Sequence, residues 1–171
     1  MNRFAKFSVD RKYRYFLVRT WDHNKPQLTF ITMHADEADE KTDSYDVKKC
    51  IDIAKRHGFG AICIVCVFAR ITGSNEALAT IVDPVGVAND MYIRQMLSAV
   101  PTNRVILAWG TIRNISKIWV PRYHKVSEMA FESKKQVSVL GLNNDGSPLR
   151  PKEFLITNPL IDMDFFHGPK H

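Results

Sequence analysis

The longest apolar run of the chain, GAICIVCVFA at 60–69, shows no alternation of polar and apolar positions. Such a run predicts a strand that is covered on both faces, as in the centre of a parallel sheet. RVILAW at 104–109 and QVSVLGL at 136–142 predict two further strands. KYRYFLVRTW at 12–21 alternates in part and is followed, after a turn, by an apolar stretch at 27–33. We expect these last two strands to pair as an antiparallel hairpin.

Helical periodicity lies between the strands. Residues 45–57 place apolar side chains at i, i+3, i+4 and i+7, and Gly58 predicts the end of that helix. Three more helices are predicted, at 72–82, 86–100 and 123–135. Because strands and helices alternate, we predict an α/β fold of three layers, α/β/α, with a mainly parallel central sheet and an N-terminal antiparallel hairpin.

The length of 171 residues suits one domain, so we predict a single α/β domain at 1–157 and a C-terminal tail at 158–171. No apolar run reaches the roughly 20 residues of a membrane helix, and the N-terminal residues lack the apolar core of a signal peptide. We therefore expect a cytoplasmic protein with no membrane partner, while the oligomeric state stays open. Cys63 and Cys66 form a C-x-x-C inside the apolar run, which favours buried thiols over zinc or redox chemistry.

The net charge is +6, and the basic residues gather in two places. One group comprises Arg3, Lys6, Arg11, Lys12, Arg14 and Arg19, and the other comprises Arg104, Arg113, Lys117, Arg122 and Lys125. The acidic residues concentrate at 36–46. A basic surface around an acidic pocket suits a polyanionic partner such as nucleic acid or a nucleotide. A solvated surface with a modest excess of positive charge explains the same pattern equally well.

The stretch QLTFITMHADEADEKTDSYD at 27–46 joins an apolar strand to an acidic loop and the start of a helix. Open α/β proteins place their ligands at the carboxyl ends of the strands, so we expect a site where this strand ends. His34 lies there and suits a general base or a hydrogen-bond donor, or is simply a loop histidine. Asp36 and Asp39 are candidates to polarise a water, whereas residues 40–46 are expected to be linker and helix cap.

Several short motifs follow one another in a fixed order: KKCI at 48–51, VFAR at 67–70, DPVGVAND at 83–90, AWG at 108–110 and DGSP at 145–148. In this order, over about residues 12–155, the chain resembles the domain-of-unknown-function family 1643 of bacteria and phages. The layout of that family resembles in outline the uracil-DNA glycosylase fold, in which a strand-end loop activates water and a late loop stabilises the leaving base. The resemblance therefore implies action at a nucleobase or its glycosidic bond.

Two positions depart from the family pattern. Its Asn-Pro-Ser-Thr, which precedes Ala-Asp, is replaced by His34-Ala35-Asp36-Glu37, and its late His-Pro is replaced by Arg150-Pro151. The match keeps Asp39 and sets His34 at a position where the family has a polar asparagine. These departures leave open a protein that binds its partner without catalysis.

We predict that His34, Asp36 and Asp39 are catalytic. A second group, at strand ends, in the DPVGVAND motif and in the late loop, is predicted to bind the ligand: Phe68, Arg70, Asn89, Asp90, Trp109, Gly110 and Arg150. Within it the arginines suit phosphate and the aromatic residues suit a base. The structural alternatives are core packing for the aromatic residues and helix capping for the Asn-Asp pair.

Three functions follow from these patterns. The leading one is a nucleic-acid- or nucleotide-directed protein, glycosylase-like if it is an enzyme, that needs no cofactor and no metal ion. The second is a non-catalytic, phage-type effector or binding module that contacts a host protein or nucleic acid. The third is a metal-dependent phosphoesterase that uses Asp36, Asp39 and Asp43.

Overall fold

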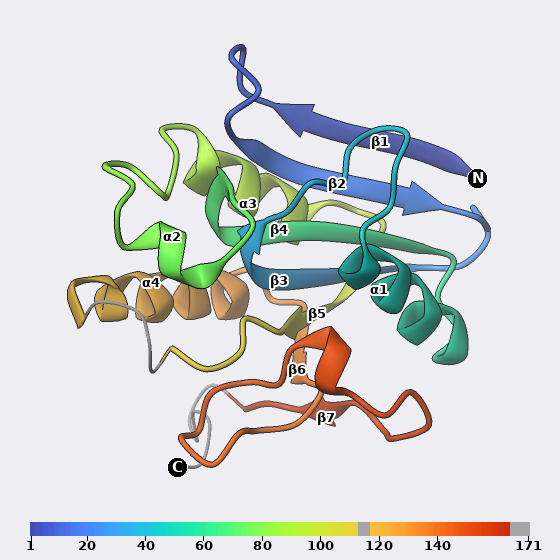
Figure 1. Ribbon diagram of the computed structural model, residues 1–171. Coiled ribbons are helices and arrows are strands. Elements are labelled where there is room, and N and C mark those ends of the chain that lie inside the picture. Colours follow the sequence, from blue (N-terminus) through green and yellow to red (C-terminus); the bar gives the residue numbers. More distant parts are fainter. Residues whose placement is uncertain (113–116, 165–171) are drawn as a thin grey trace.

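The computed structural model describes residues 1–112 and 117–164. Within them, strands form one sheet in the order β1-β2-β4-β3-β5-β6-β7 (Figure 1). The strands are β1 (Asn2–Phe7), β2 (Arg14–Thr20), β3 (Gln27–Ala35), β4 (Ala61–Ile71), β5 (Thr102–Leu107), β6 (Gln136–Val139) and β7 (Ile161–Asp162). The α/β fold class is confirmed. The sheet is mixed, with three parallel and three antiparallel pairings, so the prediction of a mainly parallel sheet is corrected.

The antiparallel hairpin is formed by β1 and β2, and the predicted pairing of 12–21 with 27–33 is wrong. β2 pairs with β4, which lies between β2 and β3. The backbone N–H groups of Trp21 and Asp22 donate to Gly60 O at 2.9 and 3.0 Å, so the turn after β2 is bonded to the start of β4. β3 takes a central position with parallel partners on both edges, β4 and β5, as suits a strand buried over most of its length.

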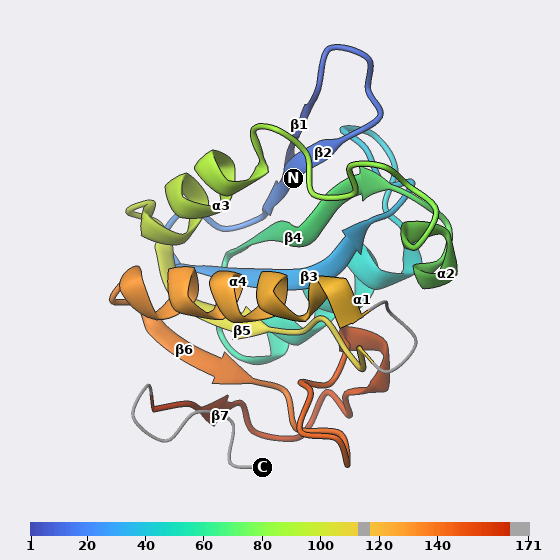
Figure 2. The ribbon, with the colours of Figure 1, turned by 90° about the vertical axis from the view of Figure 1, so that its left-hand side faces the viewer.

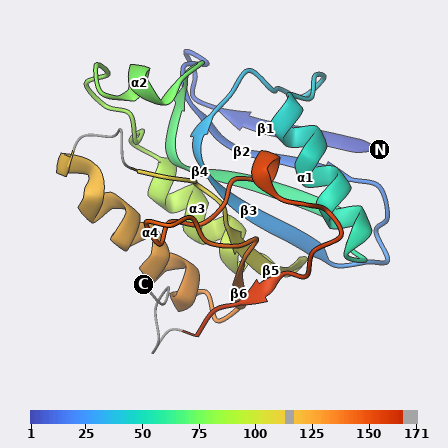
Figure 3. The ribbon, with the colours of Figure 1, turned by 60° about the horizontal axis from the view of Figure 1, so that its bottom comes forward.

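Helices cover both faces of the sheet (Figures 2 and 3). α1 (Tyr45–Arg56) packs on one face, and α3 (Asn89–Ser98) and α4 (Val120–Glu132) pack on the other, in front of the sheet in Figure 2. Alternate residues of β4 divide between the two cores, with Ile62, Ile64 and Cys66 on the α1 side and Cys63, Val65 and Val67 opposite. Both faces of β4 are therefore buried, which explains its uninterrupted apolar run.

Local signals fixed the ends of α1. Ser44 is its N-cap, and the Oγ atom accepts a hydrogen bond from Val47 N at 3.2 Å. Gly58 follows the helix with φ +84°, a conformation that glycine adopts without strain. Basic side chains in the last turn and Asp46 in the first complement the helix dipole. The predicted helix at 45–57 is confirmed to within one residue.

The remaining elements are short. α2 (Asn75–Leu78) is shorter than predicted, and two 3-10 turns are η1 (Lys117–Trp119) and η2 (Pro151–Glu153). β7, within the predicted tail, pairs with β6, while residues 165–171 of that tail lie outside the described residues.

All three cysteines are buried and free of disulfides. Among the described residues, no helix has the length and apolarity to cross a membrane.

Candidate functional site

A cavity of about 490 Å³ opens at the carboxyl end of β3. It is lined by the end of β3, the loop and first turn leading into α1, residues 72–76 after β4, and residues 150–152 at the start of η2. Ala108, directly after β5, also lines it. The chain leaves β3 toward α1 on one face and leaves the adjacent β5 toward α4 on the other (Figure 3). Ligand sites of open α/β sheets lie where the connections change faces in this way.

Two buried arginines of β2 hold the loop between β3 and α1, residues 36–43, here called the acidic loop. Arg14 is 2% exposed, and its Nη1 donates to Asp36 Oδ1 at 2.7 Å. Arg19 is fully buried, and its Nε donates to Asp43 Oδ1 at 2.8 Å. Both guanidinium groups also donate to backbone carbonyl oxygens of the loop. These pairs fix the loop, because either charge left alone in the interior would be costly.

The first basic cluster of the sequence therefore serves internal ion pairs. Besides the two arginines of β2, Arg3 binds Asp43 at 2.8 Å, and Arg11 binds Glu40 through two hydrogen bonds of 3.0 Å. Four of the six basic side chains in that cluster thus pair with the acidic loop. The positive surface available to a polyanion is smaller than the sequence suggested. In the second cluster, Arg113 lies outside the described residues.

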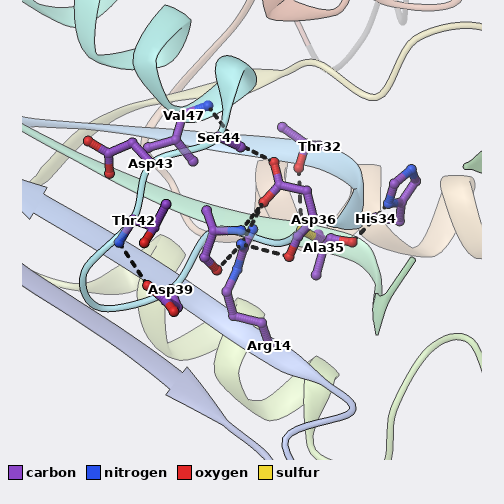
Figure 4. Close-up of polar contacts among 12 residues, drawn as sticks. Arg14, Thr32, His34, Ala35, Asp36, Asp39, Thr42, Asp43, Ser44 and Val47 are labelled. Carbon is purple, nitrogen blue, oxygen red and sulfur yellow. Dashed lines mark hydrogen bonds and ion pairs between the residues drawn. The ribbon is translucent and has the colours of Figure 1, made fainter. Parts of the chain in front are cut away.

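Asp36 is the junction of this network (Figure 4). Its Oδ1 accepts from Arg14 and from Ala38 N, and its Oδ2 accepts from Ser44 Oγ at 2.5 Å. Burial by itself would raise the pKa of Asp36, but the positive charge of Arg14 and the hydrogen bonds outweigh it and hold the pKa below that of an ordinary aspartate. Asp36 therefore carries a fixed negative charge at the cavity wall.

Asp46 lines the same cavity from the first turn of α1, and its pKa is shifted in the opposite direction from that of Asp36. Burial, and after it the negative charge of Asp36, raises the pKa of Asp46, although Lys152, Arg150 and His34 oppose the rise. The sequence prediction treated Asp46 as helix cap and so missed it. Its position was the available signal, because the helix that follows a site-bearing strand begins beside the carboxyl end of that strand.

His34 lines the cavity as predicted and is half-buried. Its Nδ1 lies 2.9 Å from Ala35 O, and because a carbonyl oxygen only accepts, Nδ1 carries the proton of this bond. The neutral ring then presents Nε2 as its proton-accepting atom. Asp39 is not among the lining residues. Its carboxylate accepts from two backbone N–H groups, those of Lys41 and Thr42, and these bonds lower its pKa.

Arg150 lines the cavity together with His34, and Gly110 lies against it. Gly110 has φ +80°, and a Cβ atom there would meet Arg150 Cγ at 2.5 Å, so only glycine leaves room for this arginine. Arg150 donates from Nε and Nη2 to Glu153 Oε1 at 2.9 and 2.6 Å. Lys152 also lines the cavity and is exposed. The η2 side of the cavity therefore carries its accessible positive charge.

Phe68 and Trp109 lie in the core on the opposite face of the sheet, outside the cavity lining. Phe68 is fully buried and packs edge-on against Trp119 and Tyr123, with ring centroids 5.6 and 5.9 Å apart. Trp109 packs against Tyr123 at 5.8 Å. The contacts of both residues are those of core packing.

Asn89, Asp90 and Arg70 are likewise absent from the cavity lining. Asn89 is fully buried at the start of α3, and its Nδ2 donates to backbone carbonyl oxygens of β4 at 3.0 and 3.3 Å. Asp90 binds Arg122 at 2.5 Å, and Arg70 lies 5.6 Å from the ring centre of Tyr13. The structure thus brings together His34, Asp36 and Arg150 from the predicted site, with Gly110 beside them, and separates the rest.

The carboxylates of the metal hypothesis have other partners. Asp36 and Asp43 bind buried arginines, and Asp39 binds the backbone of its own turn. Across residues 1–112 and 117–164, no group of three or more His, Cys, Asp or Glu side chains is placed to hold a metal ion. A metal-dependent phosphoesterase therefore has no support from this arrangement.

A known family covers most of this architecture. The model of the family described as "Protein of unknown function (DUF1643)" matches residues 14–152. The chain belongs to the DUF1643 family. The resemblance seen in the ordered motifs is thereby confirmed, and every residue that lines the cavity of this DUF1643 protein, from Arg14 to Lys152, falls within the matched region. No curated protein and no solved structure matches the chain.

Proposed function

We propose that this DUF1643 protein is a hydrolase that cleaves the N-glycosidic bond of a nucleotide, free or within nucleic acid. One observation carries the proposal: a single cavity holds Asp36 and Asp46, whose surroundings move their pKa values in opposite directions, beside His34. Neighbouring acids whose pKa values are pushed apart are a mark of acid–base sites. The cavity volume of about 490 Å³ lies within the ~300–1,000 Å³ range of small-molecule sites.

Hydrolysis of an N-glycosidic bond makes three demands on a site. The C–N bond breaks with its electron pair going to the base nitrogen, which needs a proton, and the sugar carbon becomes positive. A water then attacks that carbon and loses a proton. Asp46, which keeps its proton to higher pH than an ordinary aspartate, donates to the base nitrogen. Asp36 supplies a fixed negative charge toward the sugar cation, and His34 Nε2 accepts the proton of the water.

The net products are free base and a sugar hydroxyl. Proton exchange with solvent returns His34 to its neutral form and Asp46 to its protonated form, so no other reactant is consumed. The outline resemblance of the family to the uracil-DNA glycosylase fold favours the same bond as target, by analogy of fold. The cavity residues supply the chemical argument.

The charges of the lining favour a ligand rich in hydrogen-bond donors. Glu37 and Glu76 add carboxylates to the two aspartates, and base N–H and sugar O–H groups donate to such oxygens. Arg150 and Lys152 suit a phosphate group on the η2 side. Because Arg150 already binds Glu153, a phosphate must compete with that carboxylate.

The test is release of free base from a panel of nucleosides, nucleoside monophosphates and oligonucleotides that carry common and deaminated bases, followed by chromatography. Asp46→Asn removes the acid and keeps its shape. Asp39→Asn makes the same change in the acidic loop, outside the cavity lining. We expect wild type and D39N to release base from at least one panel member and D46N to release none.

Failure of the wild type to release base from any panel member would contradict the proposed reaction. Equal release by all three proteins would leave the reaction in place and remove Asp46 from it.

A binding module without catalysis is the second candidate. It is favoured by the internal pairing of Arg14 with Asp36 and of Arg150 with Glu153, since these pairs leave fewer free charges to act on a substrate. This candidate predicts tight binding of one host protein or nucleic acid and no base release from the panel.

A further inference from the structure

A chain of contacts leads from the buried part of β2 to the cavity (Figure 4). Arg14 Nη1 donates to Asp36 Oδ1 at 2.7 Å, and Ser44 Oγ donates to Asp36 Oδ2 at 2.5 Å. Ser44 Oγ in turn accepts from Val47 N at 3.2 Å, as the N-cap of α1. Asp46 is the second residue of that helix. The contacts thus join a buried cation, a fixed anion and the helical turn that carries Asp46.

We infer that Arg14, Asp36 and Ser44 are positioning residues that hold a fixed negative charge beside the first turn of α1, the turn that carries Asp46 into the cavity. Arg14 keeps Asp36 ionised, since a buried guanidinium strongly favours the charged form of a carboxyl group next to it. Ser44 keeps the turn and the charge together, because its hydroxyl bonds to both. This chain of contacts from Arg14 through Asp36 and Ser44 to the first turn of α1 is here called the relay. Its importance for catalysis rests on the proposed function.

Other charged groups of the cavity bear on Asp46 as well. The negative ones are Asp36, Glu37 and Glu76, and the positive or titratable ones are His34, Arg150 and Lys152. Glu37, Glu76 and Lys152 are exposed, so solvent screens them, and the charge of Arg150 is offset by Glu153. Among these cavity carboxylates, Asp36 is the one that is mostly buried and held in its charged form by an ion pair with a buried guanidinium group.

Burial contributes to the rise in the pKa of Asp46 independently of the relay. The two causes are separable, because a change at Asp36 removes the neighbouring charge and leaves Asp46 in place. Asp43 offers a matched control. It lies on the same acidic loop and binds a buried arginine, but it does not line the cavity.

The experiment is titration of the aspartate carboxyl groups by ¹³C NMR in wild type, Asp36→Asn and Asp43→Asn. It needs no substrate, so its outcome is independent of whether the protein hydrolyses nucleotides. In wild type we expect Asp46 to titrate at higher pH than an ordinary aspartate and Asp36 at lower pH. In D36N the Asp46 midpoint should shift downward, and in D43N it should stay at the wild-type value.

Ser44→Ala provides a second variant that keeps both charges, for use if D36N fails to fold. It cuts the link between Asp36 and the helix turn, so the Asp46 midpoint should again shift downward. An Asp46 midpoint at or below the ordinary aspartate range in wild type would overturn the relay. An unchanged midpoint in folded D36N or S44A, or an equal shift in D43N, would overturn it as well.

Discussion

Replacing Arg14 by Met tests the buried ion pair that holds the acidic loop. The Arg14 side chain is 2% exposed and that of Asp36 is 19% exposed. Without the guanidinium, the Asp36 carboxylate keeps its hydrogen bonds from Ala38 N and Ser44 Oγ in a mostly buried position. Removing one partner of a buried pair costs ~3–5 kcal/mol. Because Asp36 keeps two hydrogen bonds and some contact with solvent, we expect the lower end, about 3 kcal/mol.

The assay is urea unfolding followed by far-UV circular dichroism, with thermal unfolding alongside. A loss of about 3 kcal/mol lowers the Tm of a domain of this size by roughly 6–12 °C. The urea midpoint should fall without a change in slope, since the variant keeps the same fold.

Arg11→Met is the matched control. Arg11 also binds a carboxylate of the acidic loop, that of Glu40, through two hydrogen bonds. Both side chains are largely exposed, 54% and 41%, and exposed pairs of this kind contribute little to stability. We expect the urea midpoint of R11M to stay close to that of wild type. An R14M variant as stable as R11M would refute the assignment of Arg14 as the anchor of the loop.

Two further predictions concern acid stability and glycine. Asp36 and Asp43 have pKa values below that of an unfolded aspartate despite burial, because arginines hold them as anions. Their contribution to the free energy of unfolding is therefore present above the unfolded pKa and is lost as pH falls through the folded pKa. The urea midpoint of wild type should decline as the solution is acidified, and it should decline less steeply in D36N and D43N. A wild-type midpoint that does not change with pH would contradict this prediction. Both Gly58 and Gly110 have positive φ, so alanine at either should cost roughly 1–2 kcal/mol. Gly110→Ala should lose more stability than Gly58→Ala, because a Cβ atom there displaces Arg150, whereas a Cβ atom at Gly58 meets nothing. Equal Tm losses would argue against the close approach.

The elements that could be predicted from the sequence have local causes. β4 is evident from its apolar run, and α1 from its spacing, from Ser44 and from Gly58. The partners of β2 and β3 could not be predicted from local sequence. β3 lies between β4 and β5, and this placement depends on the arrangement of the whole sheet. Adjacency in sequence favoured a hairpin, and the short charged strand β1 gave no apolar signal, with most of its residues exposed.

Some residues of the candidate site could be predicted from the sequence, and others could not. His34 and Arg150 could be placed together from strand-end position and motif order, and both line the cavity. Phe68 and Trp109 belong to strand ends too, but both side chains lie in the core on the opposite face. Trp109 follows the alternation of its strand, since Leu107 lies in the same core. Phe68 breaks the alternation of β4, because it shares that core with Val67 beside the register shift in the pairing of β3 and β4. Asp46 was missed because the rise in its pKa depends on burial and on Asp36, which no spacing in the sequence encodes.

The proposed role of Asp46 as general acid is tested most directly by comparing leaving groups in wild type and D46N. With a natural purine base, which departs poorly unless it is protonated, loss of the acid should slow hydrolysis by about 10²–10⁴-fold. With a nitrophenyl leaving group on the same sugar, which departs as an anion without a proton, D46N should keep nearly the wild-type rate. An equal loss with both leaving groups, or a D46N protein as fast as wild type on the natural base, would contradict the account.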